Sequence, residues 1–75
     1  MPHVEIKCYP GRTEEQKLEC AKSIAQDIVD TLGCDITHVS VAIKDVEKSD
    51  WKEQVYDRVL AEDGKYLYKK PEYEC

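Results

Sequence analysis

The sequence lacks the features that mark several large classes of small proteins. Only two arginines, Arg12 and Arg58, stand among 11 basic residues, and 16 acidic residues give a net charge of −5. Such an acidic chain is poorly suited to nucleic acid. The longest apolar stretch, Val39–Ile43, is broken by Ser40 and is far shorter than the roughly 20 residues of a membrane span. The first residues have no apolar core of a signal peptide. We therefore expect a cytoplasmic protein that binds neither nucleic acid nor membranes.

Familiar catalytic and metal-binding motifs are also missing. There is no glycine-rich phosphate loop and no Ser/His/Asp motif, and neither histidine has metal-ligand spacing with a cysteine. The four cysteines contain no Cys-x-x-Cys pair, so we expect reduced thiols that pack as small apolar residues, and no metal. A redox or metal function remains a minor alternative, and its residues would be Cys8, Cys20, Cys34 and Cys75.

The first half of the chain has the pattern of a strand, a helix and a second strand. Apolar and polar residues alternate over residues 3–9, and Pro10-Gly11 indicates a turn. Thr13 and Gln16 have the spacing of a capping box, and Gly33 is a typical helix stop. The predicted helix spans residues 14–32, with apolar residues along one face at positions 18, 21, 24, 25, 28, 29 and 32. Alternation around Val39–Ile43 predicts the second strand.

These elements predict a small α/β (α+β) domain over residues 1–75, with a β-α-β crossover and parallel strands. Asp50 resembles the cap of a second helix that extends to about residue 61, and Gly64 interrupts it. The tail after Gly64 alternates apolar and polar residues, as a short strand or an extended arm would.

Two strands and one long helix are too few for a stable isolated sheet, because one sheet face would meet water. We therefore expect a homo-oligomer that completes the fold. The tail tyrosines could serve as interface anchors or as a clasp on their own subunit, and the sequence favours neither; they are Tyr66, Tyr68 and Tyr73.

Pro2 is the residue that suggests chemistry. An initiator methionine before proline is normally removed, and removal of Met1 would leave a secondary amine at the start of a strand. Partial desolvation disfavours the charged form of an amine and lowers its pKa. Such an amine could act as a general base near neutral pH. Alternatively, Pro2 only stiffens the entry to the strand, because its φ is fixed.

The motifs around Pro2 resemble the 4-oxalocrotonate tautomerase family. They are Pro2-His3-Val4-Glu5-Ile6-Lys7 and, after a fixed interval, Gly11-Arg12-Thr13-Glu14-Glu15-Gln16-Lys17. The segment Val39-Ser40-Val41-Ala42-Ile43, the Trp51 region and the ending Lys69-Lys70-Pro71-Glu72-Tyr73 are more similar to the PptA-type branch. The resemblance covers nearly the whole chain. It implies a β-α-β tautomerase fold and an isomerase that interconverts enol and keto forms of small 2-oxo acids.

The resemblance also implies roles for individual residues. Pro2 would move the proton, and Arg12 would hold a substrate carboxylate and stabilise developing charge. Trp51 aligns with the aromatic wall of the pocket, and Tyr9 aligns with another lining position. A general base and one preorganised donor suffice for a 1,3-proton transfer, so no metal and no organic cofactor are expected.

Ser40 departs from the family pattern, because well-known members carry an arginine at this position. The loss of one cation favours a monoacid such as phenylenolpyruvate over a dicarboxylate, and Ser40 could still donate one hydrogen bond. The longer tail leads us to expect a dimer rather than a hexamer. The same departure motivates an alternative, in which the chain is a catalytically inactive binding module with a tautomerase fold.

Overall fold

A computed structural model describes residues 1–75, which divide into two compact units, Met1–Asp45 and Val46–Cys75. The expectation that residues 1–75 form a single domain stays a prediction. No helix in the chain has both the length and the apolar character that a membrane crossing requires.

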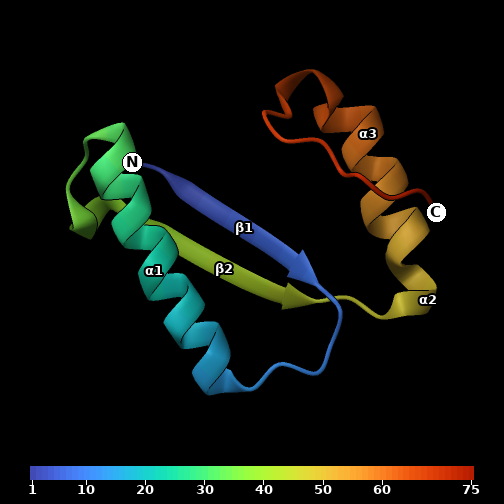
Figure 1. Ribbon diagram of the computed structural model, residues 1–75, viewed down its shortest axis with the longest axis horizontal. Helices are drawn as coiled ribbons and strands as arrows, with labels where there is room; N and C mark the ends of the chain where they lie inside the picture. The colour runs from blue at the N-terminus through green and yellow to red at the C-terminus, as the bar shows by residue number, and fades with distance from the viewer. The chain divides into compact units, whose positions relative to one another are not determined.

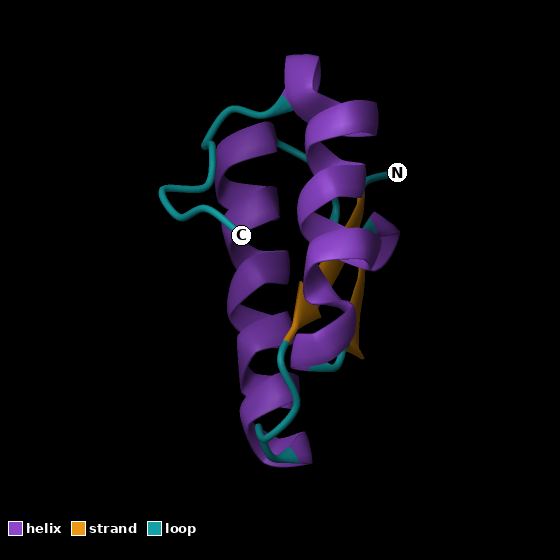
Figure 2. Ribbon diagram, turned by 90° about the vertical axis from the view of Figure 1, so that its right-hand side faces the viewer, coloured by secondary structure: helices purple, strands orange, loops and turns teal.

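The first unit is the predicted β-α-β crossover (Figure 1). It contains β1 (His3–Cys8), α1 (Glu14–Leu32), a short 3-10 turn (Ile36–His38) and β2 (Ser40–Asp45). The two strands are parallel, with His3 opposite Ser40 and Ile6 opposite Ile43. They lie side by side as a two-stranded sheet (Figure 2). The predicted fold class and strand direction are therefore confirmed.

Local signals set the ends of α1 where the sequence predicts them. The Thr13 hydroxyl accepts a hydrogen bond from the Gln16 backbone at 3.1 Å, and the Gln16 side chain accepts one from the Thr13 backbone at 2.9 Å. This reciprocal pair satisfies two donors that the first turn leaves free. At the other end Gly33 adopts a left-handed conformation, with φ of 70°, and its N–H donates to Val29 at 3.1 Å. Glycine reaches this conformation without a steric penalty.

The two faces of the sheet differ in character. The face toward α1 carries the apolar residues Val4, Ile6, Cys8, Val41 and Ile43, because side chains alternate along a strand. The opposite face carries His3, Glu5, Lys7, Ser40, Ala42 and Lys44. On it, Lys44 Nζ donates to Glu5 Oε1 at 3.1 Å, and Lys7 Nζ lies 3.8 Å from the same oxygen. This second face is polar enough to meet water, so it does not itself require a covering subunit.

In the second unit, the helix begins earlier than the sequence predicts. The helical stretch consists of α2 (Lys48–Trp51), a π-helical segment (Lys52–Tyr56) and α3 (Asp57–Asp63), followed by a 3-10 turn (Gly64–Tyr66). The expectation that Asp50 caps this helix is wrong, because Glu47 holds the cap position and Asp50 lies in the first turn. An acidic residue also suits the first turn, where backbone N–H groups point outward. The final residues, 67–75, form no strand; they have bends and no regular structure, and we call this segment the extended arm.

Candidate active site

Pro2 lies directly before β1, at the end of the sheet where both strands begin. Its carbonyl accepts a hydrogen bond from the Ser40 backbone N–H at 3.2 Å, and Pro2 itself is half-buried. Ser40 also contacts His3, since the Ser40 Oγ lies 2.6 Å from the His3 Nδ1. Of the predicted site residues, the structure therefore brings Pro2 and Ser40 together.

Arg12 and Tyr9 lie at the other end of the same strand. The Arg12 guanidinium donates to the Tyr9 carbonyl at 3.0 Å, and Tyr9 follows the last residue of β1. This bond keeps Arg12 beside the carboxyl end of β1. The two predicted binding residues are thus close to one another and both are exposed.

One chain does not bring Pro2 and Arg12 together. The six residues of β1 separate them, and at about 3.3 Å per residue the strand is about 20 Å long. A small 2-oxo acid cannot contact both ends of such a strand. The candidate site of a single chain is therefore two half-sites, one with Pro2 and Ser40 and the other with Tyr9 and Arg12.

Trp51 belongs to the second unit, at the end of α2. Its indole Nε1 donates to the Tyr73 hydroxyl at 2.9 Å, and the Tyr73 ring packs against Tyr56 with centroids 5.4 Å apart. Tyr73 is thus a clasp on its own chain. Tyr66 and Tyr68 are 65% and 105% exposed, and their role as interface anchors stays a prediction.

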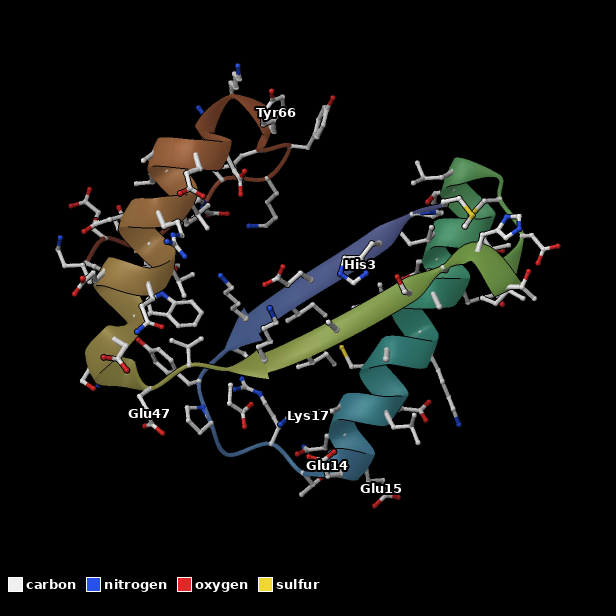
Figure 3. All side chains as sticks on the ribbon, turned by 180° about the vertical axis from the view of Figure 1, so that it is seen from behind. His3, Glu14, Glu15, Lys17, Glu47 and Tyr66 are labelled. Carbon is white, nitrogen blue, oxygen red and sulfur yellow. The ribbon has the colours of Figure 1, made fainter.

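A cavity of about 320 Å³ lies in the first unit, between the apolar sheet face and the start of α1; its lining residues are Ile6, Cys8, Arg12, Gln16, Lys17, Cys20 and Ile43. Lys17 bonds to Asp45 at 3.0 Å. This hydrogen bond, reinforced by the charges of Asp45 and Glu14, raises the pKa of the Lys17 ammonium group. Lys17 and Glu14 are labelled at the beginning of α1 in Figure 3. The sequence analysis did not predict that Gln16 and Lys17 line this cavity, although both belong to the motif at the start of α1.

The cysteines and acidic residues form no metal centre. All four thiols are free. No group of three or more His, Cys, Asp or Glu side chains is arranged to hold a metal ion. Cys8 and Cys20 line the cavity, and Cys34 and Cys75 do not. The expectation that the protein needs no cofactor stays a prediction.

Comparison with known proteins identifies the family. A family model described as tautomerase enzyme matches residues 2–62. Tautomerase PptA from Enterobacter sp. (strain 638) is 42% identical over 74 residues, which cover 97% of both chains. A Xylella fastidiosa protein with the name "Probable tautomerase" is 41% identical over 73 residues, covering 97% of this chain and 89% of that protein.

A solved structure supports the fold. TomN, a 4-oxalocrotonate tautomerase homologue in the tomaymycin biosynthetic pathway, superimposes with a TM-score of 0.65 at 18% identity, covering 76% of this chain and 92% of TomN. This chain and TomN therefore have a similar arrangement of strands and helices. The chain belongs to the tautomerase enzyme family of isomerases, in its 4-oxalocrotonate tautomerase branch, with tautomerase PptA among its relatives.

Proposed function

We propose that the chain is a cofactor-independent tautomerase of the cytoplasm that converts small enol acids such as phenylenolpyruvate to their keto forms, with Pro2 as the general base. The observation that carries this proposal is the position of Pro2. It opens β1, and the Ser40 N–H holds its carbonyl at 3.2 Å, so its ring has a fixed place at the end of a sheet. A fixed base can be aligned with a bound substrate, which is a large part of general-base catalysis.

The chemistry requires that Met1 be removed. While Met1 is attached, the Pro2 nitrogen is an amide and has no basic lone pair. After removal it is a secondary amine, and burial at the end of the sheet would disfavour its charged form and lower its pKa. The amine takes the proton from the enol hydroxyl and returns it to the adjacent carbon. The carbon–carbon double bond becomes the carbon–oxygen double bond, and no electrons are gained or lost.

The separation of the two half-sites implies that two copies of the chain build one site. Arg12 of a second copy, in antiparallel orientation, would lie at the Pro2 end of the first copy and bind the substrate carboxylate. Tyr9 would accompany it, and Trp51 would exclude water from the base. The small core supports association, because Val55 is the one buried apolar residue, at 8% exposure. We propose a homodimer rather than a hexamer.

Ser40 sets the proposed substrate class. It is a neutral hydrogen-bonding residue next to Pro2, whereas a cation there would suit a second carboxylate. A monocarboxylate with an uncharged aryl or alkyl tail leaves no negative charge unpaired. The small-molecule partner is therefore a 2-oxo monoacid rather than a dicarboxylate.

A substitution at Pro2 tests the proposal. Pro2→Ala should lower the ketonisation rate of phenylenolpyruvate by at least about tenfold, because a primary amine without the ring replaces the aligned secondary amine of proline. Intact mass must first show that Met1 is absent from both proteins. Pro71→Ala, in the extended arm, is the matched control and should retain activity. Unchanged turnover in Pro2→Ala, with an unchanged circular dichroism spectrum, would exclude Pro2 as the base.

The neutral Ser40 also favours a second candidate, a catalytically inactive binding module. A protein without Met1 that binds 2-oxo acids but shows no ketonisation of aryl or alkyl enol acids would support that function. Turnover that disappears in Pro2→Ala would exclude it.

A further inference from the structure

We propose that His3 and Ser40 form a hydrogen-bonded pair that donates to the substrate carboxylate at the Pro2 end of the sheet, beside Arg12 of the second copy, with Ser40 as the contact and His3 as its positioning residue. This inference rests on the proposed tautomerase function and adds a second contact to the carboxylate that Arg12 of the second copy would bind.

The geometry places Ser40 between His3 and Pro2. His3 and Ser40 are direct neighbours in the parallel register, and the His3 Nδ1 is 2.6 Å from the Ser40 Oγ. The Ser40 backbone N–H meanwhile donates to the Pro2 carbonyl at 3.2 Å. The serine backbone is thus fixed to the residue that would act as base, and its hydroxyl is fixed to the imidazole. Figure 3, which views the sheet from the side opposite α1, shows the His3 ring lying over this face.

The hydrogen bond between His3 Nδ1 and Ser40 Oγ can have either atom as its donor, and in both cases the pair keeps one N–H or O–H group free to donate to a ligand. When the His3 Nδ1 carries a hydrogen and donates to the Ser40 Oγ, the serine O–H is free to donate to a ligand. When the Ser40 hydroxyl donates to Nδ1, the free donor is the Nε2–H of the imidazole. Protonation of the ring forces the first arrangement and adds a positive charge. The pair therefore always offers one donor to an anion, and a cation as well at acidic pH.

The charges around His3 leave it available for a ligand. Residues 1–6 and 27–43 contain no lysine or arginine, so His3 and His38 are the basic side chains near the starts of the strands. On the same face, Glu5 is the nearest acid, and it is paired with Lys44 at 3.1 Å and with Lys7 at 3.8 Å. In the turn before β2, the Asp35 carboxylate is bound by the Thr37 backbone and hydroxyl. The neighbouring acids thus already have partners of their own.

Two serine variants test whether Ser40 is the contact. Ser40→Ala should raise KM for phenylenolpyruvate about tenfold, because a hydrogen bond to a charged group is lost. Ser40→Thr keeps the hydroxyl and should remain near the wild-type value. Equal KM values for wild type and Ser40→Ala would overturn the proposal.

A pH comparison tests the role of His3. The non-reacting acid 3-phenylpropanoate should bind wild type more tightly at pH 6 than at pH 8, and His3→Gln should lose a large part of this gain, since glutamine bonds but does not ionise. His38→Gln, which changes the other histidine, should keep the wild-type gain. Identical pH dependence in His3→Gln and wild type would overturn the role of His3. If His3→Gln fails to fold, as judged by circular dichroism, the comparison of Ser40→Ala with Ser40→Thr decides alone.

These results separate the inference from the proposed function. Pro2→Ala tests the base, and its turnover decides whether the chain is a proline-dependent tautomerase. A protein that needs Pro2 but has wild-type KM in Ser40→Ala and in His3→Gln would retain the proposed function and refute only the His3–Ser40 pair.

Discussion

The indole Nε1 of Trp51 donates a hydrogen bond to the hydroxyl of Tyr73, 2.9 Å away, and the two residues connect α2 with the extended arm. Tyr73 also packs on Tyr56. Because residues 67–75 contain no regular structure, these side-chain contacts hold the arm in place.

Removal of this hydrogen bond should loosen the arm. Tyr73→Phe keeps the ring but deletes the acceptor, and it should lower the free energy of unfolding by about 1 kcal/mol. Trp51 is the single tryptophan, so its fluorescence reports the change directly in a urea titration. Tyr68→Phe is a matched control because Tyr68 is fully exposed. An equal urea midpoint for Tyr73→Phe and wild type would show that the bond contributes nothing.

A mixture of two impaired variants should recover activity if one site uses two copies of the chain. Pro2→Ala replaces the secondary amine of the base by a primary amine, and Arg12→Ala removes the carboxylate contact. A mixed dimer holds one site with neither change. Equal amounts, unfolded and refolded together, should regain about one quarter of wild-type activity. Each variant refolded alone is the control. A mixture no more active than its components would mean that Pro2 and Arg12 act within one chain.

The thermal midpoint should rise with protein concentration. Val55 is the one buried apolar side chain of an isolated chain, so much of the native stability must come from association, which follows mass action. Calorimetry over a hundredfold concentration range, with light scattering at each concentration, measures this dependence. A constant midpoint would show that the isolated chain is stable by itself.

Acid should weaken the polar face of the sheet through Glu5. The hydrogen bond and charge of Lys44 lower the pKa of the Glu5 carboxyl below its ordinary value. A carboxyl with a lower pKa in the folded state stabilises the fold above its unfolded pKa, about 4.3, and this contribution disappears as the pH falls through the folded pKa.

Glu5→Gln cannot ionise and should therefore lose less stability than wild type between pH 6 and pH 3. Urea midpoints at low salt measure the difference, and added salt should reduce it. Glu74→Gln, in the extended arm, should behave as wild type. Parallel pH curves for Glu5→Gln and wild type would contradict the role of this ion pair.

The elements of the first unit were predictable because their signals are local. The capping box of Thr13 and Gln16 and the left-handed Gly33 set the ends of α1 within a few residues of sequence. The start of the second helix was not predicted, because acidic residues favour both the cap and the first turn and Asp50 occupies the turn. Nothing in the residues of Lys52–Tyr56 indicated the π-helical segment.

The candidate site was only partly predictable. The motifs identified Pro2 and Arg12, but the sequence analysis did not predict that the six residues of β1 separate them within one chain. The contact between His3 and Ser40 depends on the register of two strands that are distant in sequence, and alternation alone does not fix that register. Periodicity gives the face of each residue but not its neighbour on the next strand.

The register of β1 and β2 also affects which strand alignment forms during folding. A slip of one residue would turn Val41 and Ile43 away from α1. This alignment is unfavourable because it exposes apolar side chains to water. A slip of two residues keeps every side chain on its proper face and even sets Glu5 opposite Lys44. It would, however, part Ser40 from both His3 and Pro2. The pair that we assign to substrate recognition therefore also discriminates the native alignment from its most similar competitor.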